Sequence, residues 1–196
     1  MTQTLSVHNL GSGSSGNALL IRAGSAAMLV DCGVAKRTIS QALTAHGLKL
    51  EHLATVAISH EHGDHIRSLD VLGEAGAPIL ATRGTLDALG PLGRGGCAVR
   101  AGHEHVAGPF WIRPLPVSHD ATDPCGYTIN VGGRRITVLT DLGQPPAGLS
   151  DVLTVSDLIV LEANYDSHML ACGPYPAHLK HRIVASTGHL SNVQCG

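Results

Sequence analysis

The stretch LATVAISHEHGDH, residues 53–65, joins an apolar run to a dense cluster of metal-binding side chains. Its first seven residues have the length and unbroken hydrophobicity of a β-strand covered on both faces. His60, His62, Asp64 and His65 follow at once, and neutral imidazole and carboxylate are ligands for zinc, manganese or iron. In looping backbone, His60 and His62 can share one cation while Asp64 and His65 turn towards a second. A solvated polar loop is the alternative, and a structural zinc site is disfavoured because no cysteine lies nearby.

The same arrangement recurs along the chain, where apolar strands end at an acid or a histidine. The residues at these predicted strand ends are Asp31, His60, His119, Asp141 and Glu162. Layered α/β folds gather catalytic groups at strand ends, because the strands are rigid and the following loops are open. We therefore expect His119 and Asp141 to complete a metal site with the loop at residues 60–65.

The remaining pattern predicts short strands and a few helices. Gly47 is the expected end of the first helix, and Gly132-Gly133 is the expected turn of a hairpin. His103 and His105 flank Glu104 without a following Asp-His pair, so we expect them in a surface loop. The strands are expected at residues 5–9, 18–22, 27–31, 53–59, 79–81, 110–117, 126–131, 134–140 and 158–162, and the helices at 34–46, 85–89 and 178–185.

Composition limits the class of protein. The chain has 196 residues, 43% of them hydrophobic, which suits a single domain with its own core. A net charge of −2 excludes a strongly basic nucleic-acid-binding protein, although not a local basic patch. Five scattered cysteines without a CxxC pair predict a reduced, cytoplasmic compartment. No targeting segment is visible, and no apolar stretch is long enough to span a membrane.

Several segments together resemble a known family. HEHGDH, the distant His119 and TDLG (140–143) resemble the metallo-β-lactamase superfamily. Six further segments are similar to its YycJ/WalJ-type branch: SGSSGN (12–17), DCG (31–33), SHDATDPCGY (118–127), EANYD (162–166), PYPAHLKHRI (174–183) and GHLSN (188–192). The resemblance implies an α/β fold of the αββα sandwich type and an enzyme that hydrolyses phosphodiester bonds, a 5′-to-3′ exonuclease with DNA as its substrate.

The resemblance also implies a ligand set for two divalent ions, zinc or manganese. His60, His62 and His119 would hold the first ion, Asp64 and His65 the second, and Asp141 would bridge the two. Such a centre supplies hydroxide at neutral pH, which would attack phosphorus in line.

Asp64, Glu162 and His189 are the expected catalytic residues. In the related tRNA-processing nucleases a glutamate and a histidine from such loops assist proton transfer, and Glu162 and His189 match those positions. His189 is thus the expected general acid to the leaving oxygen. For His189 the alternative is a metal ligand or a helix-capping residue.

The glycine-rich segment at residues 11–17 leads into a strand-like run and not into a helix, which argues against a phosphate-binding loop of the usual kind. We expect a tight loop beside the metal site, with Ser14, Ser15 and Asn17 in contact with substrate. Basic residues could contact a nucleic-acid backbone or be ordinary surface charges; they are Lys36, Arg37, Lys180 and Arg182.

The family normally supplies one more histidine ligand after a further strand, and this sequence ends at Gly196. We therefore expect residues 1–196 to be a single domain that is incomplete at its C-terminus, with a weakly held second metal and reduced activity. Two alternatives remain: a thioester, lactone or lactam hydrolase on the same fold, and an inactive metal-binding protein. The native metal and the oligomeric state stay open.

Overall fold

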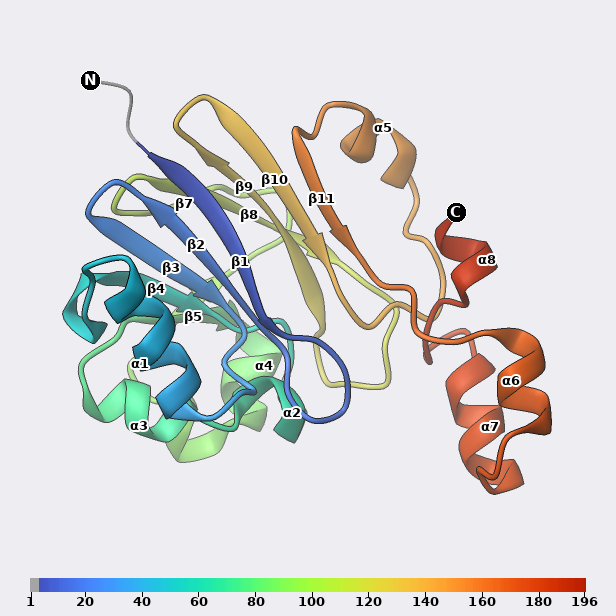
Figure 1. The fold of residues 1–196 in the computed structure, drawn as a ribbon. Helices are drawn as coiled ribbons and strands as arrows, with labels where there is room; N and C mark the ends of the chain where they lie inside the picture. Colours follow the sequence, from blue (N-terminus) through green and yellow to red (C-terminus); the bar gives the residue numbers. More distant parts are fainter. Residues whose placement is uncertain (1–3) are drawn as a thin grey trace.

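Two β-sheets face each other in the computed structural model, which describes residues 4–196 (Figure 1). The first sheet has six strands in the order in which they follow along the chain: β1 (Leu5–Gly11), β2 (Ala18–Ala23), β3 (Ala26–Val30), β4 (Leu53–Ala57), β5 (Ile79–Thr82) and β6 (Cys97–Val99). The second has five, in the order β11 (Leu158–Leu161), β10 (Arg134–Leu139), β9 (Cys125–Val131), β8 (Phe110–Pro116) and β7 (His105–Ala107). This is the two-sheet α/β sandwich that the sequence predicts.

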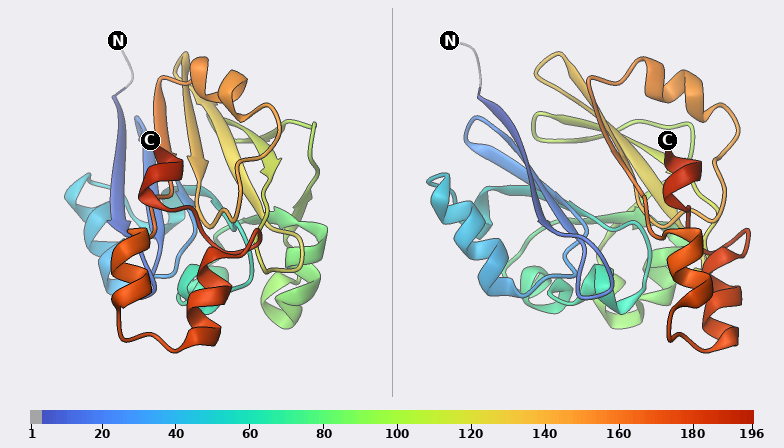
Figure 2. Two further views of the ribbon diagram at one scale, coloured as in Figure 1. Left: turned by 90° about the vertical axis from the view of Figure 1, so that its right-hand side faces the viewer. Right: turned by 45° about the vertical axis from the view of Figure 1, so that its right-hand side comes forward.

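Helices lie outside the two sheets. On the first sheet they are α1 (Lys36–Ala45), α2 (Gly63–Ile66), α3 (Leu69–Glu74) and α4 (Arg83–Ala88), with short 3-10 turns at Leu50–His52 and Gly90–Gly93. Beyond the second sheet are α5 (Leu149–Thr154), α6 (Ser167–Cys172), α7 (Ala177–Val184) and α8 (Asn192–Cys195), as the right-hand view of Figure 2 shows. Within residues 4–196 no helix has the length and apolarity needed to cross a membrane.

Strand alternation explains how one sheet serves two cores. Leu20 of β2 packs against the helices, whereas its neighbours Leu19 and Ile21 pack between the sheets. In β3, Leu29 faces the helices and Met28 faces the second sheet. Successive strand residues point to opposite faces, so a strand buried on both sides must be apolar throughout. The unbroken apolar runs of the sequence therefore correspond to this doubly covered sheet.

Strand direction brings the polar strand ends to one rim. Strands β3, β4 and β5 are parallel, so the chain leaves β3 at Asp31 and β4 at Ser59 on the same side. In the second sheet β10 is parallel to β11, and β8 and β10 are both antiparallel to β9. Strands β8, β10 and β11 therefore run the same way, and the chain leaves them towards His119, Asp141 and Glu162.

Most of the predicted strands and helices are confirmed, with boundaries shifted by a few residues. Gly47, Gly132 and Gly133 all have positive φ, as a helix stop and a hairpin turn require. The expectation of a loop at His105 is wrong, because His105–Ala107 pairs with β8 as an edge strand. The short helices α3, α5 and α6 were not predicted, since six residues display little of a helical period; the equally short α4 was expected at residues 85–89.

Candidate metal centre

Three histidines converge at this rim, and they come from loops that follow strands of the two different sheets. The ligand nitrogens of His60, His62 and His119 all lie within 4.8 Å of one another. His119 Nε2 is 3.3 Å from His62 Nδ1, and His119 Nδ1 is 3.1 Å from the Gly188 carbonyl oxygen, which orients the ring. Such an outer partner is typical of a metal-binding histidine.

His60 gives the clearest indication that a cation fits here. Its side chain is buried, and its Nε2 has no hydrogen-bond partner among the residues that the structure describes. Buried polar atoms nearly always have a hydrogen-bond partner, so this unpaired nitrogen indicates a binding site for a ligand. Burial and the neighbouring His65 lower the pKa of His60 to about 2, so the ring is neutral, the form that binds metal.

A second group of ligand atoms shares His60 and adds His65 and Asp141. His65 Nε2 is 2.6 Å from Asp141 Oδ2, and His60 Nε2 is 3.8 Å from the same oxygen. Asp141 adopts φ 54°, a left-handed conformation that non-glycine residues rarely hold. Such strain is concentrated at functional sites. Asp141 belongs to this second group and also to a third, with Glu162 and His189, so its carboxylate is shared by two groups of candidate ligand atoms.

Asp31 orients His65 through the ring nitrogen that does not contact Asp141. Its Oδ2 is 2.8 Å from His65 Nδ1, and the Ser59 backbone N–H and hydroxyl both donate to its carboxylate at 2.8 Å. Although burial lowers it, the charges of Asp31 and Asp141 raise the pKa of His65 to about 10. Asp31 was not among the predicted site residues; its position at a strand end was the available signal.

Asp64 lies beside these groups and outside them. Its Oδ2 is 3.8 Å from His65 Nε2 and accepts a hydrogen bond from the Asn17 amide at 3.2 Å. Asn17 also lies 3.0 Å from His65 Nε2 and accepts from the Gly13 N–H, so it ties the 11–17 loop to the metal-binding loop. Gly33 permits this approach, since a Cβ there would lie 1.6 Å from the Asp64 carbonyl oxygen.

Glu162 and His189, which the family resemblance implies are catalytic, lie in contact. His189 Nδ1 is 2.6 Å from Glu162 Oε1 and 3.2 Å from Asp141 Oδ1. Glu162 Oε2 accepts from the backbone N–H groups of Leu142 and Leu190, which fixes the carboxylate. Although burial opposes it, the hydrogen bonds to Asp141 and Glu162 raise the pKa of His189 to about 9. His189 is therefore protonated at neutral pH and paired with two carboxylates.

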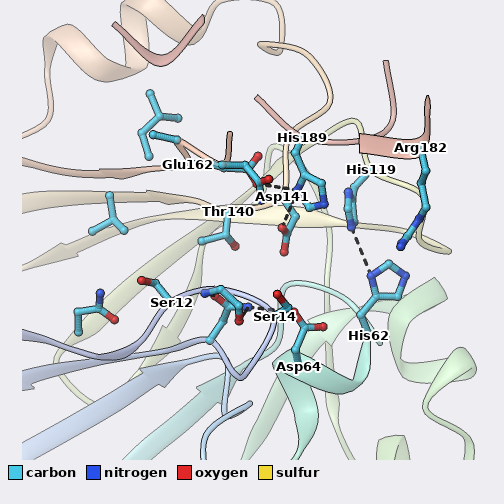
Figure 3. A pocket seen from close by; sticks show the side chains of 17 residues that line it. Ser12, Ser14, His62, Asp64, His119, Thr140, Asp141, Glu162, Arg182 and His189 are labelled. Carbon is cyan, nitrogen blue, oxygen red and sulfur yellow. Dashed lines mark hydrogen bonds and ion pairs between the residues drawn. The ribbon is translucent and has the colours of Figure 1, made fainter. Parts of the chain in front are cut away.

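Many of these side chains line one cavity of about 660 Å³, whereas the buried His60, His65 and Asp31 are not part of its lining. Figure 3 shows Asp141, Glu162 and His189 on one wall, facing Ser12, Ser14 and Asp64 on the other. Of the loop residues expected to contact substrate, Ser14 and Asn17 line the cavity and Ser15 does not. The remaining lining residues are Asn9, Gly13, His62, His119, Thr140, Val160, Leu161, Ala163, Asn164 and Arg182.

Known proteins share this sequence and this fold. A family model described as a beta-lactamase superfamily domain matches residues 27–195. The exodeoxyribonuclease YycJ of Bacillus anthracis is 30% identical over 93% of this chain and 72% of its own length. The exodeoxyribonuclease WalJ of Streptococcus pneumoniae is 32% identical over 93% and 71%, and a ribonuclease Z of Mycobacterium bovis is 32% identical over 80% and 69%.

Solved structures agree on the architecture. The metallo-beta-lactamase fold protein YhfI from Bacillus subtilis has a TM-score of 0.71 at 21% identity, covering 96% of this chain and 77% of that one. The Zn²⁺-bound PqqB from Methylobacterium extorquens has a TM-score of 0.67 at 16% identity, covering 89% and 68%. At these identities the likeness concerns the fold alone.

Proposed function

The chain belongs to the metallo-β-lactamase superfamily, and from this premise we propose that it is a metal-dependent DNA exonuclease acting in the 5′-to-3′ direction. One observation carries the proposal: two groups of candidate ligands lie beside the hydrogen-bonded Glu162–His189 pair, and His62, His119 and Asp141 line one cavity with that pair. The two exodeoxyribonucleases among the relatives favour DNA, and the ribonuclease Z makes RNA the competing substrate.

The donor set suits two divalent cations, zinc or manganese. His60, His62 and His119 would hold one, and His65 and Asp141, with Asp64 alongside, the other. Bound there, the cations would supply Lewis-acid activation of water and neutralise charge on the phosphoryl group. Asp31 orients His65 for this task, and Asn17 restrains Asp64.

His189 would move the proton. Its Nδ1 is engaged by Glu162 and Asp141, which leaves Nε2 as the nitrogen that can donate to the leaving oxygen. Glu162 keeps the imidazole charged and oriented, because its second oxygen is held by two backbone N–H groups. The pair would thus supply an acid next to the metal ligands. With Asp141 it also forms a third group of atoms that could hold a cation, and this is the alternative role of His189.

The substrate class is tested with the purified chain loaded with Mn²⁺ or Zn²⁺. The panel is duplex DNA labelled at the 5′ or the 3′ end, an RNA of the same sequence, a β-lactam and a thioester. We expect mononucleotides to be released from the 5′ end of DNA, and EDTA to stop the reaction. Preferred cleavage of RNA would overturn the DNA assignment, and faster hydrolysis of the lactam or thioester would overturn the nuclease assignment.

His189→Ala is expected to slow DNA cleavage by about 100-fold or more, the contribution typical of a positioned general acid. The metal content of the protein, measured by inductively coupled plasma mass spectrometry, is expected to stay unchanged. His103→Ala is the matched control, since His103 is exposed in a turn away from the cavity. Loss of metal in His189→Ala would show that His189 is a ligand instead of an acid.

A further inference from the structure

The cavity at the metal centre is rich in carboxylates and poor in cations. Asp64, Asp141 and Glu162 line it, and Arg182 of α7 is the one lysine or arginine to do so in the part of the chain that the structure describes. Of the other basic residues that the sequence singles out, Lys180 donates to the Ala171 carbonyl oxygen and is absent from the lining. Besides the proposed acid His189, an anionic substrate in this cavity would therefore meet Arg182 as the lining side chain with a permanent positive charge.

Arg182 is held in place by Asp120. Its Nε is 2.5 Å from Asp120 Oδ2, and its Nη2 is 3.1 Å from Oδ1. This side-on fork uses one hydrogen of Nε and one of Nη2, so three guanidinium hydrogens remain for another acceptor. The side chain is 53% exposed, and Figure 3 shows it reaching down beside His119 towards His62. A guanidinium fixed in this way loses little entropy when it binds an anion.

The Asp120–Arg182 ion pair lies next to a candidate metal ligand. Asp120 Oδ1 lies 3.3 Å from His119 Nε2, so the carboxylate stands between the guanidinium and a candidate ligand. Asp120 therefore spaces Arg182 away from the position where the reacting phosphate would sit. The nearest group on a nucleic-acid strand with the right charge and geometry is the adjacent phosphate, which guanidinium groups bind through two oxygens.

We propose that Arg182 binds the substrate phosphate next to the reacting one, with Asp120 as its positioning residue. The inference rests on the proposed nuclease function, because it requires a substrate with at least two phosphates. The competing interpretation is an ordinary surface ion pair that only ties α7 to the loop after β8. Exposed pairs of that kind contribute little to stability.

The experiment compares Arg182→Gln, Asp120→Asn and Arg134→Gln. Arg134 is the matched control, because it forms a similar exposed ion pair with Asp157 at 2.7 Å. Arg134 is the first residue of β10, whereas the cavity-lining Thr140 and Asp141 follow the opposite end of that strand. Two substrates are used: an end-labelled DNA duplex and thymidine 5′-(4-nitrophenyl phosphate), which has one phosphate. KM and kcat are measured for both across a series of salt concentrations, and DNA binding is measured by fluorescence anisotropy in EDTA.

For Arg182→Gln we expect KM for DNA to rise about 10-fold, with kcat changed little, since one charge-assisted contact is lost. The slope of log KM against log salt should fall by about one, the signature of one missing phosphate contact. The one-phosphate substrate and Arg134→Gln should be unaffected. Asp120→Asn should raise KM less and leave the salt slope unchanged.

Three results would overturn the inference: an unchanged KM for DNA, an equal rise for both substrates, or a salt slope that does not move. Anisotropy separates this failure from failure of the proposed function. If the wild-type chain binds DNA without cleaving it, the nuclease assignment fails, while the loss of binding in Arg182→Gln still decides the role of Arg182.

Discussion

Asp141→Asn is expected to reduce phosphodiester cleavage by at least ~10⁴-fold, because two catalytic contributions depend on this carboxylate. Asp141 contacts His65 at 2.6 Å and His60 at 3.8 Å, so its replacement removes the carboxylate of the candidate group His60–His65–Asp141. It also lies 3.2 Å from His189 Nδ1, so the acid loses one of its two carboxylate partners. Asparagine keeps the size and tolerates the left-handed backbone, which confines the change to charge.

Turnover and bound metal are measured together for this variant. We expect both to fall, and excess Mn²⁺ to restore turnover only in part. Asp157→Asn is the control, since Asp157 is also an ion-paired aspartate, but it lies on the surface beside Arg134. Full metal content and near-normal turnover in Asp141→Asn would contradict the assignment of Asp141 as a ligand.

Asp31→Asn is expected to destabilise the metal-free chain by about 3 kcal/mol, the cost of breaking a buried ion pair from one side. Asp31 is 2% exposed, and its partner His65 is fully buried. The asparagine keeps one oxygen for the Ser59 N–H and accepts the left-handed φ of 60°, so the lost charge is the main change. For a chain of this length the melting temperature should fall by roughly 6–12 °C.

Thermal unfolding in EDTA measures this effect, with Asp87→Asn as a control on an exposed aspartate of α4. Metal titration of the same variant should show an affinity about 10- to 100-fold weaker, because His65 loses the partner that orients its ring. Asp31→Ala should be less stable still, since alanine is strained at positive φ. A melting temperature within one degree of the wild type would contradict this account of Asp31.

Local sequence predicts those parts of the site that lie at strand ends. His60, His119, Asp141 and Glu162 each follow an apolar run, and strand direction then brings them to one rim without further information. Motif resemblance names Glu162 and His189 as catalytic residues, but nothing in the periodicity of either segment shows that they meet. Only the folded chain shows the 2.6 Å distance.

The supporting contacts could not be predicted in the same way. The Asp120–Arg182 fork joins residues of a loop and a short helix, and ion pairs between exposed side chains leave no trace in hydrophobic patterning. Asn17 is a similar case. It was expected to contact substrate, but its side-chain amide contacts Gly13, Asp64 and His65. Which acceptor an amide meets depends on tertiary geometry, here the close packing allowed by Gly33.

The division of the candidate ligands between the two sheets has a consequence for how the chain would acquire a metal. His60, His62 and His65 come from the first half of the chain, whereas His119, Asp141 and His189 come from the second. During synthesis the early half emerges with a ligand set that cannot close around a cation, so tight capture must wait until the sheets dock. A bound metal would then add its binding free energy to the docking of the two sheets, a non-local step of folding, and scarcity of metal would weaken that docking.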